Sequence, residues 1–128
     1  MDEVQTDVDT IAEVIRLPVE RWVGRCFAVA RDIVDEALVQ GIVHLGHWMG
    51  PVAPESECAK GTAEPPYQHS WIRLPDGRVY DPTRWTFEGR EPYVYVGEDS
   101  EGYYWALQEW VNGGPRRLSD RNECSRNE

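Results

Sequence analysis

Three residues of types that together can cleave an amide bond occur in the sequence, namely Cys26, His69 and Asp81. A catalytic thiol needs a base to take its proton, a group that orients the base and a positive local potential. Cys26 follows Gly24 by two residues, so it falls in the first turn of a helix that begins at the glycine. Unpaired N–H groups and the helix dipole there stabilise an anion or a developing oxyanion. The pattern leaves two interpretations open, a nucleophile or a cysteine buried on the apolar stripe of its helix.

The segment from His69 to Asp81 predicts a β-hairpin that places the other two residues. The Pro-Asp-Gly sequence at residues 75–77 suits a type I turn followed by a left-handed glycine. In that register His69, Trp71, Val79 and Asp81 project from one face, with His69 and Asp81 about 7 to 8 Å apart at the backbone. A two-residue turn would instead put Asp81 on the opposite face. The hairpin therefore predicts that Asp81 holds one ring nitrogen of His69 while the other acts as base.

Two helices are expected to precede the strands. Apolar residues at spacings of four, three and four predict an amphipathic helix over residues 4–16, with Thr10 and Glu13 forming a capping box. A second apolar stripe predicts a core helix over residues 24–40, closed by Gly41 as its C-terminal cap. This second helix would carry Cys26 at its start.

The remaining segments predict strands and one long loop. Residues 42–49 are apolar, begin with β-branched side chains and favour a strand, as do residues 93–96. Residues 51–66 hold four prolines and no periodic pattern, which indicates a long loop. Residues 100–111 fit either a short helix with Ser100 as its N-cap or a strand, and the Gly-Gly-Pro sequence at residues 113–115 is expected to end this element.

The order of the motifs resembles the transglutaminase-like core of the papain-like cysteine enzymes. The resemblance covers about residues 22–85 and rests on G-x-C ending at Cys26, Gly-Ile opening a strand at Gly41, H-x-W beginning at His69 and D-P-T beginning at Asp81. The fifteen-residue step from Cys26 to Gly41 and the twelve-residue step from His69 to Asp81 also suit that family. Together and in this order, the motifs are more specific than any one of them alone.

The resemblance implies an α+β fold, in which N-terminal helices, one of them bearing Cys26, pack on a small antiparallel sheet bearing His69 and Asp81. It also implies acyl-enzyme chemistry on the amide of a peptide or protein. Cys26 would be the nucleophile, His69 the general base and acid, and Asp81 the orienting carboxylate. Trp22, four residues before Cys26, is a candidate for completing the oxyanion hole, and the alternative for it is a core aromatic. The chain departs from the family in being short and in its proline-rich segment before the histidine.

Two further histidines, His44 and His47, do not form a metal pair. Three residues apart on a strand, they point to opposite faces, and no Asp or Glu lies nearby in the sequence to complete a site. We therefore expect no metal and no cofactor. We expect His47 and Trp71 to line the cleft and His44 to be a partly exposed strand residue.

Composition bounds the class of protein. With 128 residues the chain suits one domain, assigned to residues 1–118, followed by a polar tail over residues 119–128. The net charge of -10 argues against nucleic-acid binding. No apolar stretch is long enough to span a membrane and the N-terminus is acidic, so a soluble cytoplasmic protein is expected. Three cysteines in unlike contexts argue against a disulfide framework, and Cys58 is expected to be an incidental exposed thiol.

These observations predict a small cysteine amidase, a peptidase or deamidase, with protein transamidation as the less favoured outcome. Hydrolysis and transamidation share a thioester and differ in whether water or an amine reaches it. The alternative is a non-catalytic acidic binding or inhibitor protein that keeps the fold and is steered toward a basic partner. The sequence leaves the substrate and the oligomeric state open.

Overall fold

The computed structural model describes residues 4–56 and 66–118. The elements follow in the order α1 (Val8–Ile15), the 3-10 helix η1 (Val19–Arg21), α2 (Cys26–Asp35), β1 (Ile42–Trp48), β2 (Tyr67–Arg73), β3 (Val79–Asp81), α4 (Trp85–Glu88), β4 (Tyr95–Gly97), β5 (Tyr104–Val111) and β6 (Gly114–Arg117). Helices and an antiparallel sheet occur together, which confirms the α+β class. The expectations for Cys58 and for the tail at 119–128 lie outside the described residues. In the two described ranges, no helix has the length and apolar character that crossing a lipid bilayer requires.

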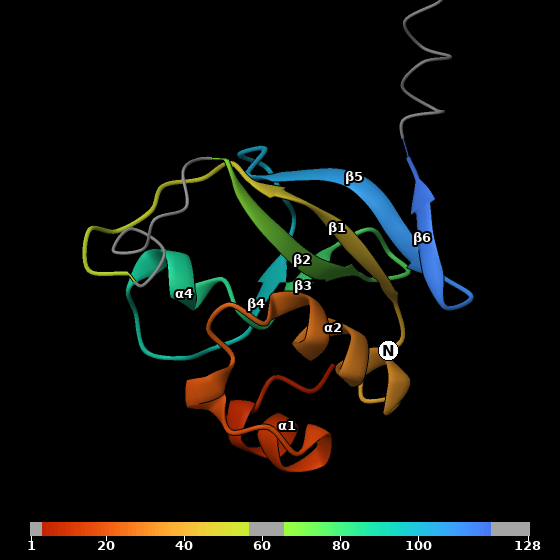
Figure 1. Cartoon of the computed structure of the whole chain (residues 1–128), viewed down its shortest axis with the longest axis horizontal. Helices are drawn as coiled ribbons and strands as arrows, with labels where there is room; N and C mark the ends of the chain where they lie inside the picture. The colour runs from red at the N-terminus through yellow and green to blue at the C-terminus, as the bar shows by residue number, and fades with distance from the viewer. Residues whose placement is uncertain (1–3, 57–65, 119–128) are drawn as a thin grey trace, which may run out of the picture.

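The six strands form one antiparallel sheet in the order β4-β3-β2-β1-β5-β6 (Figure 1). The central strand β1 pairs with β2 along its length and with β5 on its other side, where a register shift lies between Leu45 and Gly46. The short strand β3 pairs with β2 only at Ile72 and Arg73. The half of β2 that carries His69 therefore pairs with β1 and not with β3.

Apolar packing holds α2 on the sheet. Val29, Ala30 and Ile33 of the helix are fully buried and belong to one cluster with Val43 of β1 and Ile72 of β2. In Figure 1, α2 lies over β1 and β2, and α1 packs against α2. Burial of each large aliphatic side chain stabilises the fold by roughly 1.5 to 3 kcal/mol. This cluster therefore fixes where the N-terminus of α2, and with it Cys26, lies relative to the sheet.

The first helix is shorter than the sequence predicted. It begins at Val8, and the side chain of its N-cap residue, Asp7, accepts a hydrogen bond from the backbone N–H of Asp9. Thr10 lies inside the helix and donates its hydroxyl hydrogen to Asp7. The expected capping box of Thr10 and Glu13 is therefore wrong, because an aspartate three residues earlier already caps the helix.

The second helix also ends early. It stops at Asp35, and Ala37 adopts a left-handed conformation with φ of 61°. Gly41 is therefore not the C-terminal cap that was predicted. It is needed instead for a close approach, since a Cβ there would lie 2.5 Å from Cγ2 of Ile72 and 2.7 Å from the carbonyl oxygen of Arg73.

The expected strands at residues 42–49 and 93–96 correspond to β1 and β4, and the described part of the expected loop, residues 51–56, contains no helix or strand. For residues 100–111 the helix interpretation is wrong and the strand alternative is right, since β5 pairs with β1. The segment after β5 does not end the sheet. Asn112 and Gly113 have φ of 53° and 79°, a conformation typical of two-residue hairpin turns, and the chain returns as β6.

Candidate active site

The hairpin turn between β2 and β3 has the predicted form. The backbone N–H of Gly77 donates to the carbonyl of Leu74, and the N–H of Leu74 donates to the carbonyl of Arg78, both at 2.9 Å. Gly77 has φ of 93°. This is the three-residue turn with a left-handed glycine, so Asp81 projects from the same face as His69, as expected.

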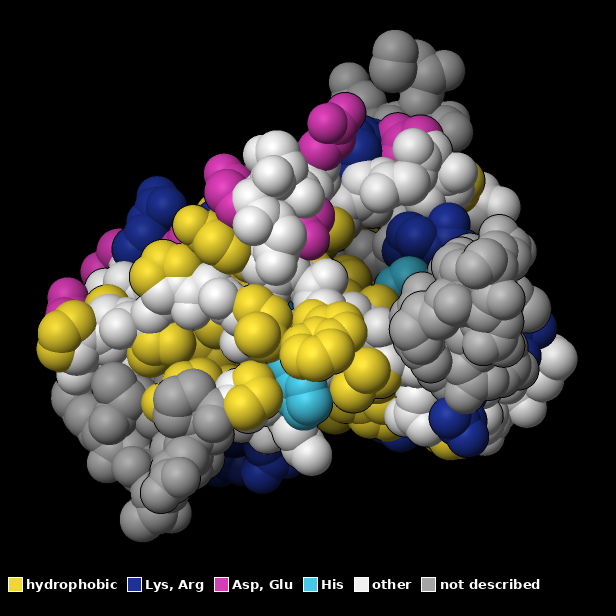
Figure 2. All heavy atoms as spheres, turned by 90° about the horizontal axis from the view of Figure 1, so that it is seen from above, with side chains coloured by type: hydrophobic (Ala, Val, Ile, Leu, Met, Phe, Trp, Pro, Cys, Tyr) yellow, Lys and Arg dark blue, Asp and Glu magenta, His cyan; other side chains and the backbone are white. Residues whose placement is uncertain are grey.

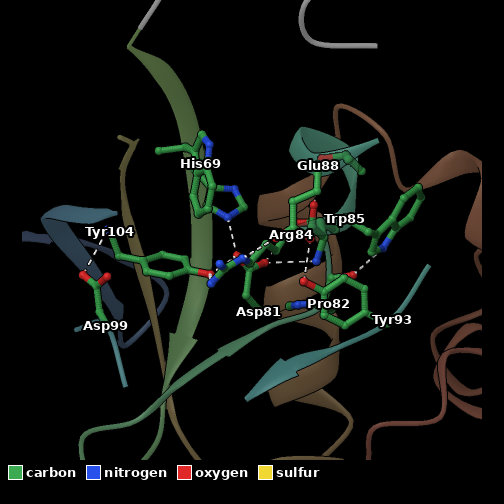
Figure 3. A network of polar contacts seen from close by, with 12 residues as sticks. His69, Asp81, Pro82, Arg84, Trp85, Glu88, Tyr93, Asp99 and Tyr104 are labelled. Carbon is green, nitrogen blue, oxygen red and sulfur yellow. Dashed lines mark hydrogen bonds and ion pairs between the residues drawn. The ribbon is translucent and has the colours of Figure 1, made fainter. Parts of the chain in front are cut away.

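The His69–Asp81 pair is direct and buried. Nε2 of His69 lies 2.7 Å from Oδ2 of Asp81, and the two side chains are 1% and 0% exposed. Tyr104 donates its hydroxyl hydrogen to the same Oδ2 at 2.8 Å. The other carboxylate oxygen accepts hydrogen bonds from the backbone N–H and the hydroxyl of Thr83, at 3.0 and 3.4 Å. Asp81 thus has partners on both oxygens, which fixes its orientation and compensates its burial (Figure 3).

The electrostatics of the pair favour a charged imidazole. Burial alone would lower the pKa of His69, but the charge and hydrogen bond of Asp81 outweigh it and raise the pKa to about 9. The interaction with Cys26 also raises the pKa of His69. The buried Nδ1 of His69 has no partner within standard hydrogen-bond limits among the described residues.

Cys26 and His69 line one cavity of about 560 Å³. Its walls come from the start of α2 (residues 24–28), from β1 (45–47), from β2 (68–70) and from residues 107 and 108 of β5. Cys26 is partly exposed and is the first residue of α2, whose N-cap residue, Arg25, makes no side-chain capping bond. The first-turn N–H groups lack partners one turn back in the helix, so they favour negative charge at the thiol. The cavity thus brings together a thiol, an imidazole and a helix end that stabilises negative charge.

An aromatic shell encloses the imidazole of His69. Phe87 meets it edge-on with ring centroids 4.8 Å apart, and the rings of Trp71, Trp48 and Tyr104 lie 5.5, 5.9 and 6.0 Å away. Such packing restricts the ring to one orientation and keeps water from its buried side. Trp71 therefore packs against the buried side of the His69 ring. It is 2% exposed and is not among the described residues that line the cavity, where it was expected.

The other residues considered in the sequence are His47, Trp22 and His44. His47 lines the cavity, as predicted. Trp22 is fully buried and donates its indole N–H to the carbonyl of Leu17 at 2.9 Å, so the core-aromatic alternative holds and the indole is not free to bind an oxyanion. His44 is only 7% exposed and accepts a hydrogen bond from Nε of Arg73 at 3.3 Å. The expectation of a partly exposed His44 is therefore wrong.

Two residues near Asp81, Tyr104 and Arg84, were not predicted from the sequence. Tyr104 stays protonated because burial and the adjacent Asp81 raise its pKa, so it remains a donor. Its oxygen also lies 3.5 Å from a guanidinium nitrogen of Arg84. Arg84 itself pairs with Glu88 at 2.9 Å (Figure 3). Its guanidinium carbon also lies 4.1 Å from the centroid of the Tyr95 ring. The signal for Tyr104 is its pairing with Trp48 between β5 and β1, and that pairing can be predicted only if β5 is recognised as a strand.

Comparison of the chain with protein-family models, with curated proteins and with solved structures finds no match.

Proposed function

We propose that the protein is a small cysteine amidase, a peptidase or deamidase, built on a papain-like core of the transglutaminase-like type. One observation carries the proposal. Nδ1 of His69 is buried without a hydrogen-bond partner among the described residues, in a cavity shared with Cys26, while Nε2 is held by Asp81. Leaving a buried ring nitrogen unpaired costs stability, so this arrangement favours a role for it. The motif order of the sequence supports the same assignment.

The chemistry follows from the roles of the three residues. The proton of the Cys26 thiol resides on His69 in an imidazolium–thiolate pair, and the thiolate attacks the carbonyl carbon of a bound amide. The C–N bond then breaks, the leaving amine takes a proton from His69, and the acyl group stays on Cys26 as a thioester. Water attacks the thioester, gives a proton to His69 and releases a carboxylic acid with the restored thiolate. Asp81 orients the imidazole and stabilises its charged form throughout.

The first turn of α2 would stabilise the oxyanion. Its backbone N–H groups point along the helix toward the cavity end, and no side chain of the N-cap residue competes for them. We propose hydrolysis, with water as the acceptor of the acyl group, as the outcome at this cavity. A nucleophilic thiol persists in a reducing compartment, and the proposal therefore includes a cytoplasmic location.

The binding-protein alternative has its own support in the surface. Figure 2 shows hydrophobic side chains gathered around a histidine on the face seen from above. Among the described residues, Trp105, Met49 and Leu107 are large apolar side chains with exposed fractions of 51%, 46% and 38%. Exposed aromatic residues are typical of contact surfaces, and the charge of -10 would attract a basic partner.

Selective alkylation separates the two functions. Limiting iodoacetamide at near-neutral pH should label Cys26 ahead of Cys58 and Cys124, with each site quantified by mass mapping. His69→Gln should remove the selectivity, whereas His47→Gln, at another cavity-lining histidine, should keep it. Thermal melts of both variants check that they fold. If Cys26 stays unlabelled in the native protein while the other thiols react, the amidase proposal is wrong and the binding protein stands.

A further inference from the structure

The cavity that holds Cys26 differs in charge from the rest of the molecule. The chain has 23 acidic and 13 basic residues, yet no Asp or Glu is among the described residues that line this cavity. Its polar lining consists of one arginine, two histidines, two glutamines and a serine. Among the residues described, this strongly acidic protein therefore places no carboxylate in the lining of the cavity. Within residues 4–56 and 66–118, the side chains that line it are neutral or positive.

Arg25 supplies a positive charge to the lining of the cavity. It is exposed and immediately precedes Cys26. Within residues 4–56 and 66–118 its side chain has no ion pair and no hydrogen bond, in contrast to Arg31, which pairs with Asp32 on the same helix. The guanidinium is therefore free to pair with a ligand, and its planar donor set matches a carboxylate.

The end of α2 adds to the same potential. The uncapped first turn carries the positive end of the helix dipole, and the imidazole of His69 is held in its charged form by Asp81. Two sources of positive potential therefore meet at one cavity, on Arg25 and on the helix end, while the charge of His69 is balanced by the carboxylate of Asp81.

From this convergence we propose that the cavity selects an amide whose acyl part carries a carboxylate, as in an acidic peptide, and that Arg25 is the residue that pairs with it. The inference rests on the proposed amidase function, because it names the substrate class of that site. Arg25 lies beside the nucleophile, so a carboxylate paired with it would belong to the acyl half that stays on Cys26 as the thioester. A substrate with a positive charge there would be repelled.

Charged thiol reagents test this without a known substrate. The rates at which Cys26 reacts with anionic sulfonatoethyl methanethiosulfonate, with its cationic trimethylammonioethyl analogue and with neutral methyl methanethiosulfonate are compared on the full chain by mass mapping. Two charges about 7 Å apart in water change each rate about threefold, so Arg25→Gln should lower the anionic-to-cationic rate ratio about sevenfold. Arg25→Lys should retain most of the ratio. Arg21→Gln is the matched control, since it removes the same charge outside the cavity lining.

The outcomes separate the two proposals. A ratio that falls in Arg25→Gln, but not in Arg21→Gln, supports the substrate class. An unchanged ratio in Arg25→Gln, or an equal fall in both variants, overturns it, and a fast reaction with the neutral reagent would then leave the amidase proposal intact. If Cys26 reacts slowly with all three reagents, the amidase function itself fails. The charge on His69 remains in every variant, so the difference between wild type and Arg25→Gln measures Arg25 alone.

Discussion

The buried His69–Asp81 pair should make the stability of the protein fall with rising pH. The pKa of His69 rises from 6.5 to about 9 in the fold, because Asp81 outweighs the effect of burial. Each pKa unit corresponds to about 1.4 kcal/mol, so protonation of His69 stabilises the folded state by about 3 kcal/mol. Both side chains are almost fully buried, and solvent therefore screens the pair little. Because the folded pKa lies above the unfolded one, this stability is fully present below pH 6.5 and is lost as the pH rises through about 9.

Urea unfolding followed by tryptophan fluorescence measures this loss. The free energy of unfolding of the wild type should drop by about 3 kcal/mol between about pH 6 and about pH 9.5. In Asp81→Asn the charge is gone and burial dominates, so the drop should vanish or reverse. His69→Gln should also remove the drop, because no group titrates at that position. Cys26→Ser keeps the pair and should keep most of the drop, which excludes the thiol as its source.

Two results would refute the reasoning. If the wild type were equally stable at both pH values within about 1 kcal/mol, His69 would not be held in its charged form by Asp81. If His69→Gln kept the full drop, another group would be responsible. Either result would also remove the orienting role of Asp81 from the proposed mechanism, since an uncharged pair would not assist the proton transfers.

Two further substitutions test the packing and hydrogen bonds of the site by thermal melts and urea unfolding. Tyr104→Phe keeps the ring but removes the hydroxyl on Asp81, and it should cost about 1 to 2 kcal/mol, whereas Tyr103→Phe, outside the Asp81 network, should cost less than about 0.5. Gly46→Ala should cost about 3 kcal/mol, because its Cβ would lie 1.9 Å from the carbonyl oxygen of Trp105, whereas Gly114→Ala enters open space and should be nearly neutral. Equal costs within either pair would contradict the geometry.

Local turn chemistry is what made the His69–Asp81 pair predictable. A proline before Asp-Gly selects the three-residue turn, and the period of two along a strand then decides which side chains share a face. The same reasoning, applied to Asn112-Gly113 between two apolar segments, would have predicted the last hairpin. The glycine and proline that follow resemble a helix stop, however, and therefore predict the end of an element instead.

Helix boundaries were predictable only in part, because several residues at each end satisfied the same pattern. Ala37 interrupts a stripe that continues to Leu38, and its left-handed backbone is not a conformation that its residue type favours. The role of Gly41 comes from contact with Ile72 and Arg73, which are distant in sequence. Such tertiary contacts override local patterns, and a single sequence does not display them.

The candidate site is assembled by two independent sets of forces, and this explains which of its parts the sequence could predict. Cys26 is placed by the apolar contact of Val29 and Ile33 with the sheet, and a helix pattern predicts that contact. His69 and Asp81 are placed by their hairpin turn. Tyr104 lies on β5 and contacts the carboxylate of Asp81 on β3. The strands β2 and β1 separate β3 from β5 in the sheet, so the role of Tyr104 depends on the complete topology. Contacts within one element or one hairpin can be predicted from residue spacing, whereas contacts between strands that are not neighbours can be predicted only once the fold is known.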